Sequence, residues 1–393
     1  MDMPLVLLGC GGVGRQLLQH IISCRSFFSA ERIYLRVVGV CDSSTFVVAS
    51  DIANEKLDDQ ILSEICRVKS KGQPLSSCDH LGNCVVHNGP EISEQLMIIA
   101  GELSDLVIVD CTASSETVEM LCHAVDIGRC VVLANKKPLT STMENYQKLM
   151  SNPRRVRYES TVGAGLPIIS SISRIKSSGD PLYRLIGSLS GTLGYVMSEV
   201  EEGKSLSDVV VSAKTLGYTE PDPRDDLSGM DVARKGLILA RLLGMPMNME
   251  DIQVESLYPH EMGPAFMSVE DFMSKGLVSL NCSIREKVEN AAKHGNVLRY
   301  VCLIENYRCE IGLKEVPASS ALGRLKGSDN AVELFSRCYE KRPLVIQGAG
   351  AGNDTTAAGV LADIVELCKM LLEVNLMSHQ LRVELLTDHY SRT

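Results

Sequence analysis

Short apolar runs alternate with segments of helical spacing over the first 150 residues. Residues 5–8 are apolar, and leucine and isoleucine then recur at helical spacing over residues 17–22. Further apolar runs predict strands at residues 36–41, 106–111 and 130–134, with a helix over residues 116–127. Residues 52–83 are polar and irregular, which indicates an inserted helix and loop. Strands that alternate with helices predict an α/β fold with a doubly wound parallel sheet.

The pattern changes after residue 153, where strands and helices no longer alternate. Strands are predicted at residues 183–189, 298–305 and 308–313, and helices at residues 206–216 and 230–243. This pattern indicates an α+β second domain. A strand at 344–347, a glycine-rich turn and a helix at 355–372 form one more unit, which we expect to return to the first domain. The predicted domains are therefore residues 1–152, 153–342 and 343–393.

Composition and charge exclude several classes of protein. Hydrophobic residues make up 45% of the 393 residues and charged residues 22%, as in ordinary soluble domains. No apolar run approaches the roughly 20 residues that cross a bilayer, so we expect no membrane association. The net charge of −10 repels polyanions, which argues against a nucleic-acid partner.

The 14 cysteines include no C-x-x-C pair and lie in apolar stretches. They are interpreted as buried, reduced thiols of an intracellular protein. Because the first strand begins at residue 5, no secretory or transit segment is predicted, and we expect a cytoplasmic location. Cys78, His80, Cys84 and His87 could supply zinc ligands, but their spacing fits no zinc motif, so we expect no zinc there.

The first strand leads into a glycine motif of the form GxGxxG. Gly9 suits the tight turn, Gly11 allows the backbone to approach a pyrophosphate, and Gly14 allows the helix to pack on the strand. The helix N-terminus then stabilises the anion. This context predicts a Rossmann-type dinucleotide-binding domain, with a merely tight turn as the alternative. The predicted cofactor-binding positions in the motif are Gly9, Gly11, Gly12, Val13 and Gly14.

Asp42 follows the second predicted strand. An acid at this position hydrogen-bonds the adenosine ribose of NAD and repels the 2′-phosphate of NADP. No Arg or Lys occurs over residues 42–53. We therefore predict binding of NAD or NADP, with NAD favoured. A helix cap or turn residue is the alternative interpretation, because Asp42 lies farther from Gly14 than the usual spacing of about 20 residues.

Acidic side chains and a lysine are concentrated over residues 220–235. Two prolines extend the backbone near Glu220 and Asp226, and a helix follows. Asp231 and Lys235 are four residues apart, so they lie on the same face of that helix. Such a lysine could exchange a hydroxyl proton with a substrate while the aspartate orients it. The alternative is a solvated salt bridge on the helix surface.

Five blocks of the chain resemble the homoserine dehydrogenase family. The longest is EPDPRDDLSGMDVARK at residues 220–235. The others are ANKK at 134–137, ESTVGAGLP at 159–167, SGTL at 190–193 and QGAGAG at 347–352. They follow the order of the family, and the resemblance runs over nearly the whole chain.

The resemblance implies reversible, NAD(P)-dependent oxidation of L-homoserine to L-aspartate 4-semialdehyde, a reaction of threonine, methionine and isoleucine biosynthesis. It implies that Lys235 is the acid/base group, that Asp231 helps to place it, and that Glu220 and Asp226 hold the substrate. The resemblance also suggests a homodimer. A non-catalytic NAD sensor on the same fold remains the alternative, although it would not need Asp231 or Lys235.

The remaining site residues also follow from the resemblance. Lys136 is implied at the junction of cofactor and substrate, with Lys137 as the competing choice, and Thr112 and Gly348 would contact the cofactor. The resemblance also implies a monovalent cation at backbone carbonyls, which we expect to be sodium, and an ion-free glycine turn is the alternative. The carbonyls would belong to Glu159, Val162, Ala164 and Leu166.

Family relatives often carry an aspartate kinase or a regulatory domain. The first predicted strand begins at residue 5 and only about twenty residues follow the last predicted helix, so we expect a monofunctional form without either domain. The glycine-rich segment 348–352 lacks the Lys-Ser/Thr of a phosphate-binding NTPase loop, and it gives no support to a kinase.

Overall fold

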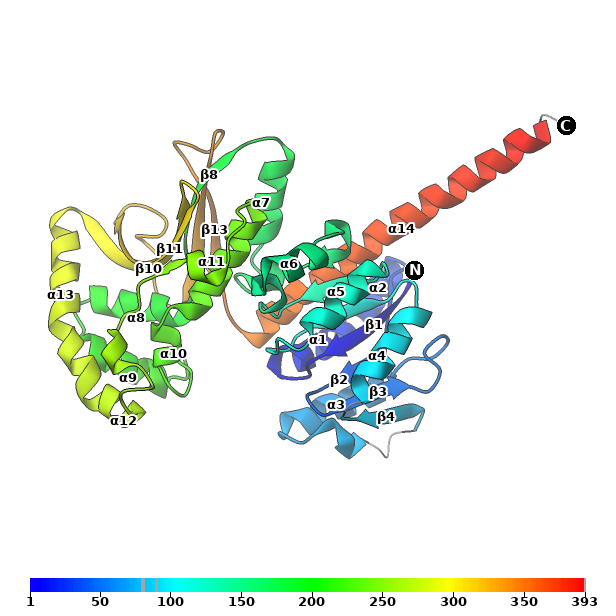
Figure 1. Ribbon diagram of the computed structural model, residues 1–393, viewed down its shortest axis with the longest axis horizontal. Helices are drawn as coiled ribbons and strands as arrows, with labels where there is room; N and C mark the ends of the chain where they lie inside the picture. The colour runs from blue at the N-terminus through cyan, green and yellow to red at the C-terminus, as the bar shows by residue number, and fades with distance from the viewer. Residues whose placement is uncertain (79–81, 90, 392–393) are drawn as a thin grey trace. The chain divides into compact units, whose positions relative to one another are not determined.

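The chain folds into two compact units. The computed structural model describes residues 1–78, 82–89 and 91–391 (Figure 1). The first unit consists of Met1–Pro138, Glu144–Tyr158 and the chain from Thr356 onwards, and the second of Leu139–Met143 and Glu159–Thr355. The polypeptide therefore crosses between the units several times, and the second unit is an insertion into the first.

The first unit contains a seven-stranded sheet with the order β4-β3-β2-β1-β5-β6-β7. Its strands are β1 (Asp2–Leu8), β2 (Tyr34–Cys41), β3 (Thr45–Ala49), β4 (Cys84–Asn88), β5 (Val107–Asp110), β6 (Cys130–Leu133) and β7 (Val156–Arg157). The five neighbouring strands β2, β1, β5, β6 and β7 are parallel, as predicted. Strands β3 and β4 add an antiparallel edge beside β2, which the sequence pattern did not predict as part of the sheet.

Helices pack against this sheet through the apolar positions expected from the periodicity. In α1 the buried residues are Gly14, Leu17, Leu18 and Ile21. The helices of this unit are α1 (Gly12–Ser23), α2 (Arg25–Ala30), α3 (Asp59–Ser70), α4 (Glu91–Glu102), α5 (Val118–Asp126), α6 (Met143–Leu149) and α14 (Asn353–Ser391). Helix α3 and a 3₁₀ turn at Leu75–Cys78 form the inserted helix predicted between residues 52 and 83.

Helix α14 completes the core of the first unit. Its residues between Ala357 and Leu371 belong to the same buried cluster as Leu5 of β1 and Val37 of β2. The predicted return of residues 343–393 to the first domain therefore applies to the helix alone. The preceding strand, β13 (Leu344–Ala349), pairs with β12 (Asp329–Ser336) and lies in the second unit.

The second unit contains a six-stranded sheet with the order β13-β12-β8-β10-β11-β9. Its other strands are β8 (Leu182–Ser188), β9 (Gln253–Val254), β10 (Asn296–Glu305) and β11 (Arg308–Pro317). Its helices are α7 (Ile168–Ser177), α8 (Gly191–Glu201), α9 (Leu206–Thr215), α10 (Arg224–Leu227), α11 (Met230–Leu242), α12 (Val269–Asp271) and α13 (Leu277–Lys293). All neighbours pair antiparallel except β11 and β9, so the unit is α+β, as predicted.

Helix α11 lies directly on strands β10 and β11. A Cβ atom added to Gly236 would lie about 3 Å from the side chains of Cys302, Cys309 and Ile311. Side chains alternate between the two faces of a sheet, so these three residues mark the face that α11 covers. The absence of a side chain at Gly236 lets the helix that carries Lys235 approach the sheet closely.

The cysteines are mostly buried. Among the 14, only Cys282 and Cys338 are exposed. Burial raises the pKa of the Cys10 and Cys41 thiols to about 12, so they are protonated and weakly nucleophilic at neutral pH. In the described part of the chain, the helices are too short or too polar to cross a lipid bilayer.

Candidate active site

The glycine motif in the first unit forms a tight strand-to-helix turn with open space above it. Gly9 has a φ of +87°, and a Cβ at Gly14 would lie 2.1 Å from the Gly9 carbonyl oxygen. A Cβ at Gly11 would meet no atom within 4 Å. Two glycines are therefore required by the fold, whereas Gly11 leaves room for a ligand.

The start of α1 fits an anionic ligand. Gly11 is the N-cap and Gly12 and Val13 begin the helix, whose first turn carries no acidic side chain and no side-chain cap. The free N–H groups of a helix N-terminus and its dipole favour a phosphate. The residues present therefore suit the pyrophosphate of a dinucleotide.

Two buried polar residues order the ends of strands β5 and β6. Asp110 accepts hydrogen bonds from the backbone of Thr112 at 2.8 Å and from Asn135 Nδ2 at 3.0 Å. Asn135 Nδ2 also donates to Thr112 Oγ1 at 3.1 Å. Thr112 is thus held at the carboxyl edge of the parallel sheet, where ligands bind in this fold. Sequence reasoning missed Asp110 and Asn135, although Asn135 lies in the ANKK block.

The structure distinguishes the two neighbouring lysines. Lys136 is half-buried, whereas Lys137 is exposed. The backbone N–H of Lys137 donates to Asn135 Oδ1 at 3.1 Å, so the turn that carries both lysines is attached to the Asp110 network. This difference in burial favours Lys136 as the residue that faces a ligand.

Asp42 has more partners than its sequence neighbourhood suggested. Its carboxylate accepts bonds from Lys69 Nζ at 2.7 Å and from the backbone of Thr45 and Leu75. Burial alone would raise the pKa of Asp42, but the hydrogen bonds, led by that from Lys69, lower it below its usual value. The prediction that Asp42 has no basic neighbour considered residues 42–53 only. It missed Lys69, which lies 27 positions later in the sequence and which helix α3 places next to Asp42.

Lys235 lies in a buried position in the second unit. Its Nζ is 3.0 Å from Asp231 Oδ2 and donates to the carbonyl of Leu189 at 2.7 Å. The lysine side chain is 11% exposed, whereas that of Asp231 is 49% exposed. An amine held by a backbone carbonyl inside the protein differs from a solvated surface pair, which supports a chemical role.

Asp226 interacts electrostatically with the carboxylates of Glu220 and Asp231, and Asp231 also pairs with this lysine. Asp226 accepts bonds from the backbone of Glu220 at 2.8 Å and from Thr192 Oγ1 at 3.1 Å. Burial raises the pKa of Asp226 most, and the carboxylates of Glu220 and Asp231 raise it further against those two bonds. A positively charged ligand would relieve this repulsion. Thr192 was missed as a site residue, although it lies in the SGTL block.

The turn that carries Glu220 and Asp226 is fixed by Arg224. Its guanidinium is buried, makes two bonds of 2.7–3.0 Å to Asp222 Oδ2, and donates to the carbonyls of Met262 and Met267. The hydrogen bonds from Arg224 lower the pKa of Asp222 below its usual value. Asp222 and Arg224 are therefore structural members of the acidic segment.

The predicted cation loop has an unusual backbone. Gly163 and Ala164 both have positive φ angles, of 82° and 56°. The Glu159 carboxylate accepts the N–H groups of Ile169 and Ser170 at the start of α7. Gly348 is close by, because a Cβ there would lie 3.0 Å from Leu166 Cδ2. The second unit therefore brings this loop and the QGAGAG segment together.

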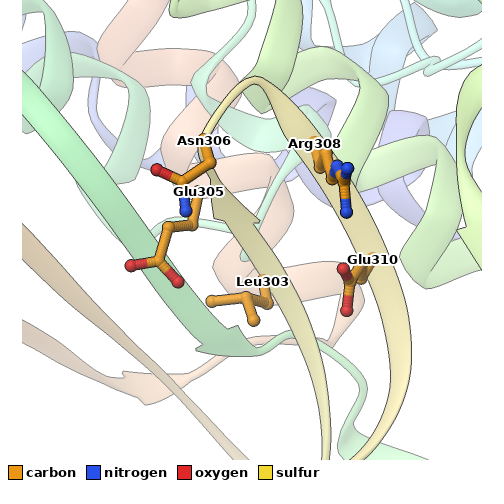
Figure 2. A pocket seen from close by; sticks show the side chains of 5 residues that line it. All are labelled: Leu303, Glu305, Asn306, Arg308 and Glu310. Carbon is orange, nitrogen blue, oxygen red and sulfur yellow. The ribbon is translucent and has the colours of Figure 1, made fainter.

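One hollow in the second unit lies away from these residues. It has a volume of about 320 Å³ at the tip of the β10–β11 hairpin (Figure 2). Leu303, Glu305, Arg308 and Glu310 alternate with Cys302 and Cys309, so they belong to the sheet face opposite α11. This hollow is not part of the candidate active site.

The zinc candidates in the sequence are Cys78, His80, Cys84 and His87. Among the side chains that the structure describes, no group of three or more His, Cys, Asp or Glu residues could hold a metal ion. His80 of the four zinc candidates lies outside the described residues.

Known proteins resemble this chain over both units. Residues 9–159 match the family described as the NAD binding domain of homoserine dehydrogenase, and residues 167–365 match homoserine dehydrogenase itself. A hyperthermophilic archaeal homoserine dehydrogenase in complex with NADPH has the same fold, with a TM-score of 0.70 and 22% identity. That comparison covers 94% of this chain and 98% of the archaeal protein.

Two curated relatives define the degree of similarity. The bifunctional aspartokinase/homoserine dehydrogenase of Buchnera aphidicola is 34% identical over 369 residues, which cover 92% of this chain and 42% of the relative. The homoserine dehydrogenase of Emericella nidulans is 40% identical over 259 residues, which cover 62% of this chain and 70% of the relative. The chain thus spans about two fifths of the bifunctional proteins. These matches, which cover both units, show that the chain belongs to the homoserine dehydrogenase family.

Proposed function

We propose that this protein interconverts L-homoserine and L-aspartate 4-semialdehyde with a nicotinamide cofactor. The observation that carries the proposal is the buried Lys235 amine, held between Asp231 and the Leu189 carbonyl beside a group of carboxylates. The cofactor, when bound, supplies the hydride acceptor or donor. Residues of this chain bind and orient the substrate and exchange its proton.

The substrate side of the reaction follows from the charges in the second unit. Glu220 and Asp226 hold the ammonium group of the amino acid, whose positive charge opposes the burial and the carboxylate repulsion that raise the pKa of Asp226. Lys235 exchanges the hydroxyl proton of the substrate, directly or through a water, and Asp231 orients the lysine. Lys136 is assigned to the cofactor and substrate junction because its side chain is half-buried.

The direct test is absorbance at the reduced-nicotinamide band with purified protein. L-homoserine with NAD or NADP is expected to give a rise, and the aldehyde with the reduced cofactor a fall. Cofactor binding without turnover in either direction would contradict the proposal and favour a non-catalytic NAD sensor.

We propose that Asp42 and Lys69 together set cofactor preference, with NAD favoured. Asp42 is anionic because its hydrogen bonds lower its pKa, and it repels a 2′-phosphate. Lys69, 2.7 Å from that carboxylate, would attract the same phosphate. The archaeal relative holds NADPH, so both cofactors should be compared.

A monovalent cation, sodium in our proposal, would bind the carbonyls of Glu159, Val162, Ala164 and Leu166. A left-handed conformation costs a non-glycine residue roughly 1–2 kcal/mol, and Ala164 adopts it. Carbonyl ligation of an ion would repay such strain. Sodium chloride should then raise the melting temperature more than tetramethylammonium chloride at equal ionic strength, and equal melting curves would contradict the site.

A homodimer is proposed through the sheet face shown in Figure 2. Arg308 is exposed on this face, Glu310 is half-buried and pairs with Lys314 at 2.6 Å, and Arg184 lies 4.0 Å from Glu305. Such a face can pair with itself about a twofold axis. Light scattering should give the mass of two chains, a smaller mass for Glu310→Arg, and restoration for Glu310→Arg with Arg308→Glu. A monomeric mass for the unmodified protein would exclude the dimer.

A further inference from the structure

Asn330 is the second residue of strand β12 and lies at the end of the sheet where Lys235 is held. The register pairs Ala331 with Ser188, the last residue of β8. Leu189, whose carbonyl accepts the bond from Lys235, follows Ser188 directly. Asn330 therefore lies at the same end of the sheet as the proposed acid/base group.

The adjoining backbone packs against helix α8, which also contacts Asp226. A Cβ on Gly194 of α8 would lie 3.6 Å from the carbonyl oxygen of Asp329, the neighbour of Asn330. The same helix carries Thr192, which donates to Asp226. Asn330 is thus placed beside the residues that hold both the lysine and the carboxylate of the proposed substrate site.

The carboxamide of Asn330 is buried without a partner. The residue is 0% exposed, and neither Oδ1 nor Nδ2 has a hydrogen-bond partner among the residues that the structure describes. Buried amides are nearly always hydrogen-bonded, because removing one from water without replacing its bonds is unfavourable. An orphaned donor and acceptor on one side chain therefore indicate a ligand that offers both.

The side chain is covered by the glycine-rich segment. A Cβ at Gly350 would lie 2.0 Å from Asn330 Cγ and Nδ2, and Asn330 pairs with Gly348 between β12 and β13. Gly350 must shift before a ligand reaches the amide. Gly352, with a φ of +120°, gives this segment a conformation that other residues rarely adopt.

The proposed substrate has the complementary groups. Its ammonium is matched by the carboxylates of Glu220 and Asp226, but its carboxylate requires a donor. Lys235 already bonds Asp231 and Leu189. We propose that the Asn330 carboxamide binds the α-amino-acid head group of the substrate, with Nδ2 donating to the carboxylate. This assignment rests on the proposed function and deepens it.

The test replaces Asn330 with leucine, which has nearly the same shape and no polar atom. Homoserine affinity is measured from KM and from the thermal shift that homoserine produces, and reduced-cofactor affinity from nicotinamide fluorescence. Asn330→Leu should weaken homoserine about tenfold or more and leave the cofactor within twofold. Its melting temperature without ligand should rise by about 2–4 °C, because the unpaired polar atoms are gone.

Asn281→Leu is the matched control. Asn281 is hydrogen-bonded to Ser207, 2.9 Å away, so this variant should lower the melting temperature and leave homoserine affinity unchanged. Weakened cofactor with unchanged homoserine affinity in Asn330→Leu would overturn the assignment to the substrate. Unchanged affinity for both, or a lower melting temperature, would overturn the role of an unpaired amide.

The same measurements separate a failure of the proposed function from a failure of the Asn330 assignment. If the unmodified protein binds the reduced cofactor but shows neither turnover nor a thermal shift with homoserine, the substrate is wrong, and this assignment is overturned with it. If the unmodified protein binds homoserine and Asn330→Leu binds it equally, the assignment to Asn330 alone fails.

Discussion

The glycine turn of the first unit and the acidic site of the second unit are built on different principles. In the turn, function depends on missing side chains: Gly9 and Gly14 satisfy the backbone, and Gly11 leaves space for a ligand. In the acidic site, function depends on side chains brought together from separate helices, such as Thr192, Asp226 and Lys235. The glycine turn is built from residues adjacent in the sequence, whereas the acidic site depends on tertiary contacts.

This contrast shows what each site tolerates. A turn defined by backbone geometry is insensitive to pH but is damaged by a single methyl group. A site defined by neighbouring charges keeps its fold after isosteric substitutions but depends on ionisation. The two sites should therefore respond differently to substitution and to pH.

Removal of the Lys235 amine should have the largest effect. Lys235→Ala is expected to lower kcat by about 10² to 10⁴, because an acid/base group is lost while the cofactor turn is intact. Lys235→Arg should also fail, since a guanidinium does not deprotonate at neutral pH. Steady-state kinetics with cofactor affinity as the control would check this, and normal turnover by Lys235→Ala would refute the assignment.

The glycine turn should respond to a methyl group in two distinct ways. Gly14→Ala places a Cβ 2.1 Å from the Gly9 carbonyl oxygen and should lower the melting temperature by about 4–8 °C. Gly11→Ala meets no protein atom, so the melting temperature should hold while cofactor affinity falls about tenfold or more. Calorimetry and cofactor titration separate the two. Equal behaviour of both variants would show that Gly11 has no special access to a ligand.

The acidic site should respond to pH. The pKa of Asp226 is raised in the free protein, chiefly by burial, so lowering the pH neutralises this carboxyl before an ordinary aspartate. A neutral carboxyl binds an ammonium group less tightly, so KM for homoserine should rise, by up to about tenfold, as pH falls toward that pKa. Asp226→Asn should have a high KM that no longer changes over this range. If KM of Asp226→Asn depended on pH in the same way as KM of the unmodified protein, the titration would belong to another group.

The smallest expected effect concerns cofactor choice. Asp42→Ala should raise the ratio of kcat/KM for NADP to that for NAD by about threefold, because a negative charge is removed. Lys69→Ala should lower the same ratio by a similar factor, since a partner for the 2′-phosphate is lost. Arg67→Ala on the same helix serves as the control, because its partner is Glu64. Shifts in the same direction for Asp42→Ala and Lys69→Ala would contradict opposing roles.

Much of the local structure could be predicted from the sequence. The glycine turn, helix α11 and the β10–β11 hairpin follow from spacing over fewer than twenty residues, and the structure has them at nearly the expected bounds. The same holds for the acid and lysine on one face of α11. Short-range periodicity carries this information because it reflects backbone geometry alone.

Long-range contacts could not be predicted in the same way. Lys69 reaches Asp42 from helix α3, and β13 pairs in the second unit although the helix after it joins the first. Asn330 is covered by Gly350, which directly follows the neighbouring strand β13. Each depends on which strand lies next to which. A single sequence contains no direct information about the order of strands in a sheet. It therefore predicts neither the partners of Asp42 nor the unit to which β13 belongs.

The place of helix α14 in the first unit also has a consequence for synthesis on the ribosome. The apolar residues from Ala357 to Leu371 complete a core whose other members begin at Met3. A nascent chain therefore exposes part of that core until this helix emerges, while the inserted second unit already has all its strands. The half of the protein translated first is thus the last to close, and premature termination before residue 357 would leave an aggregation-prone product.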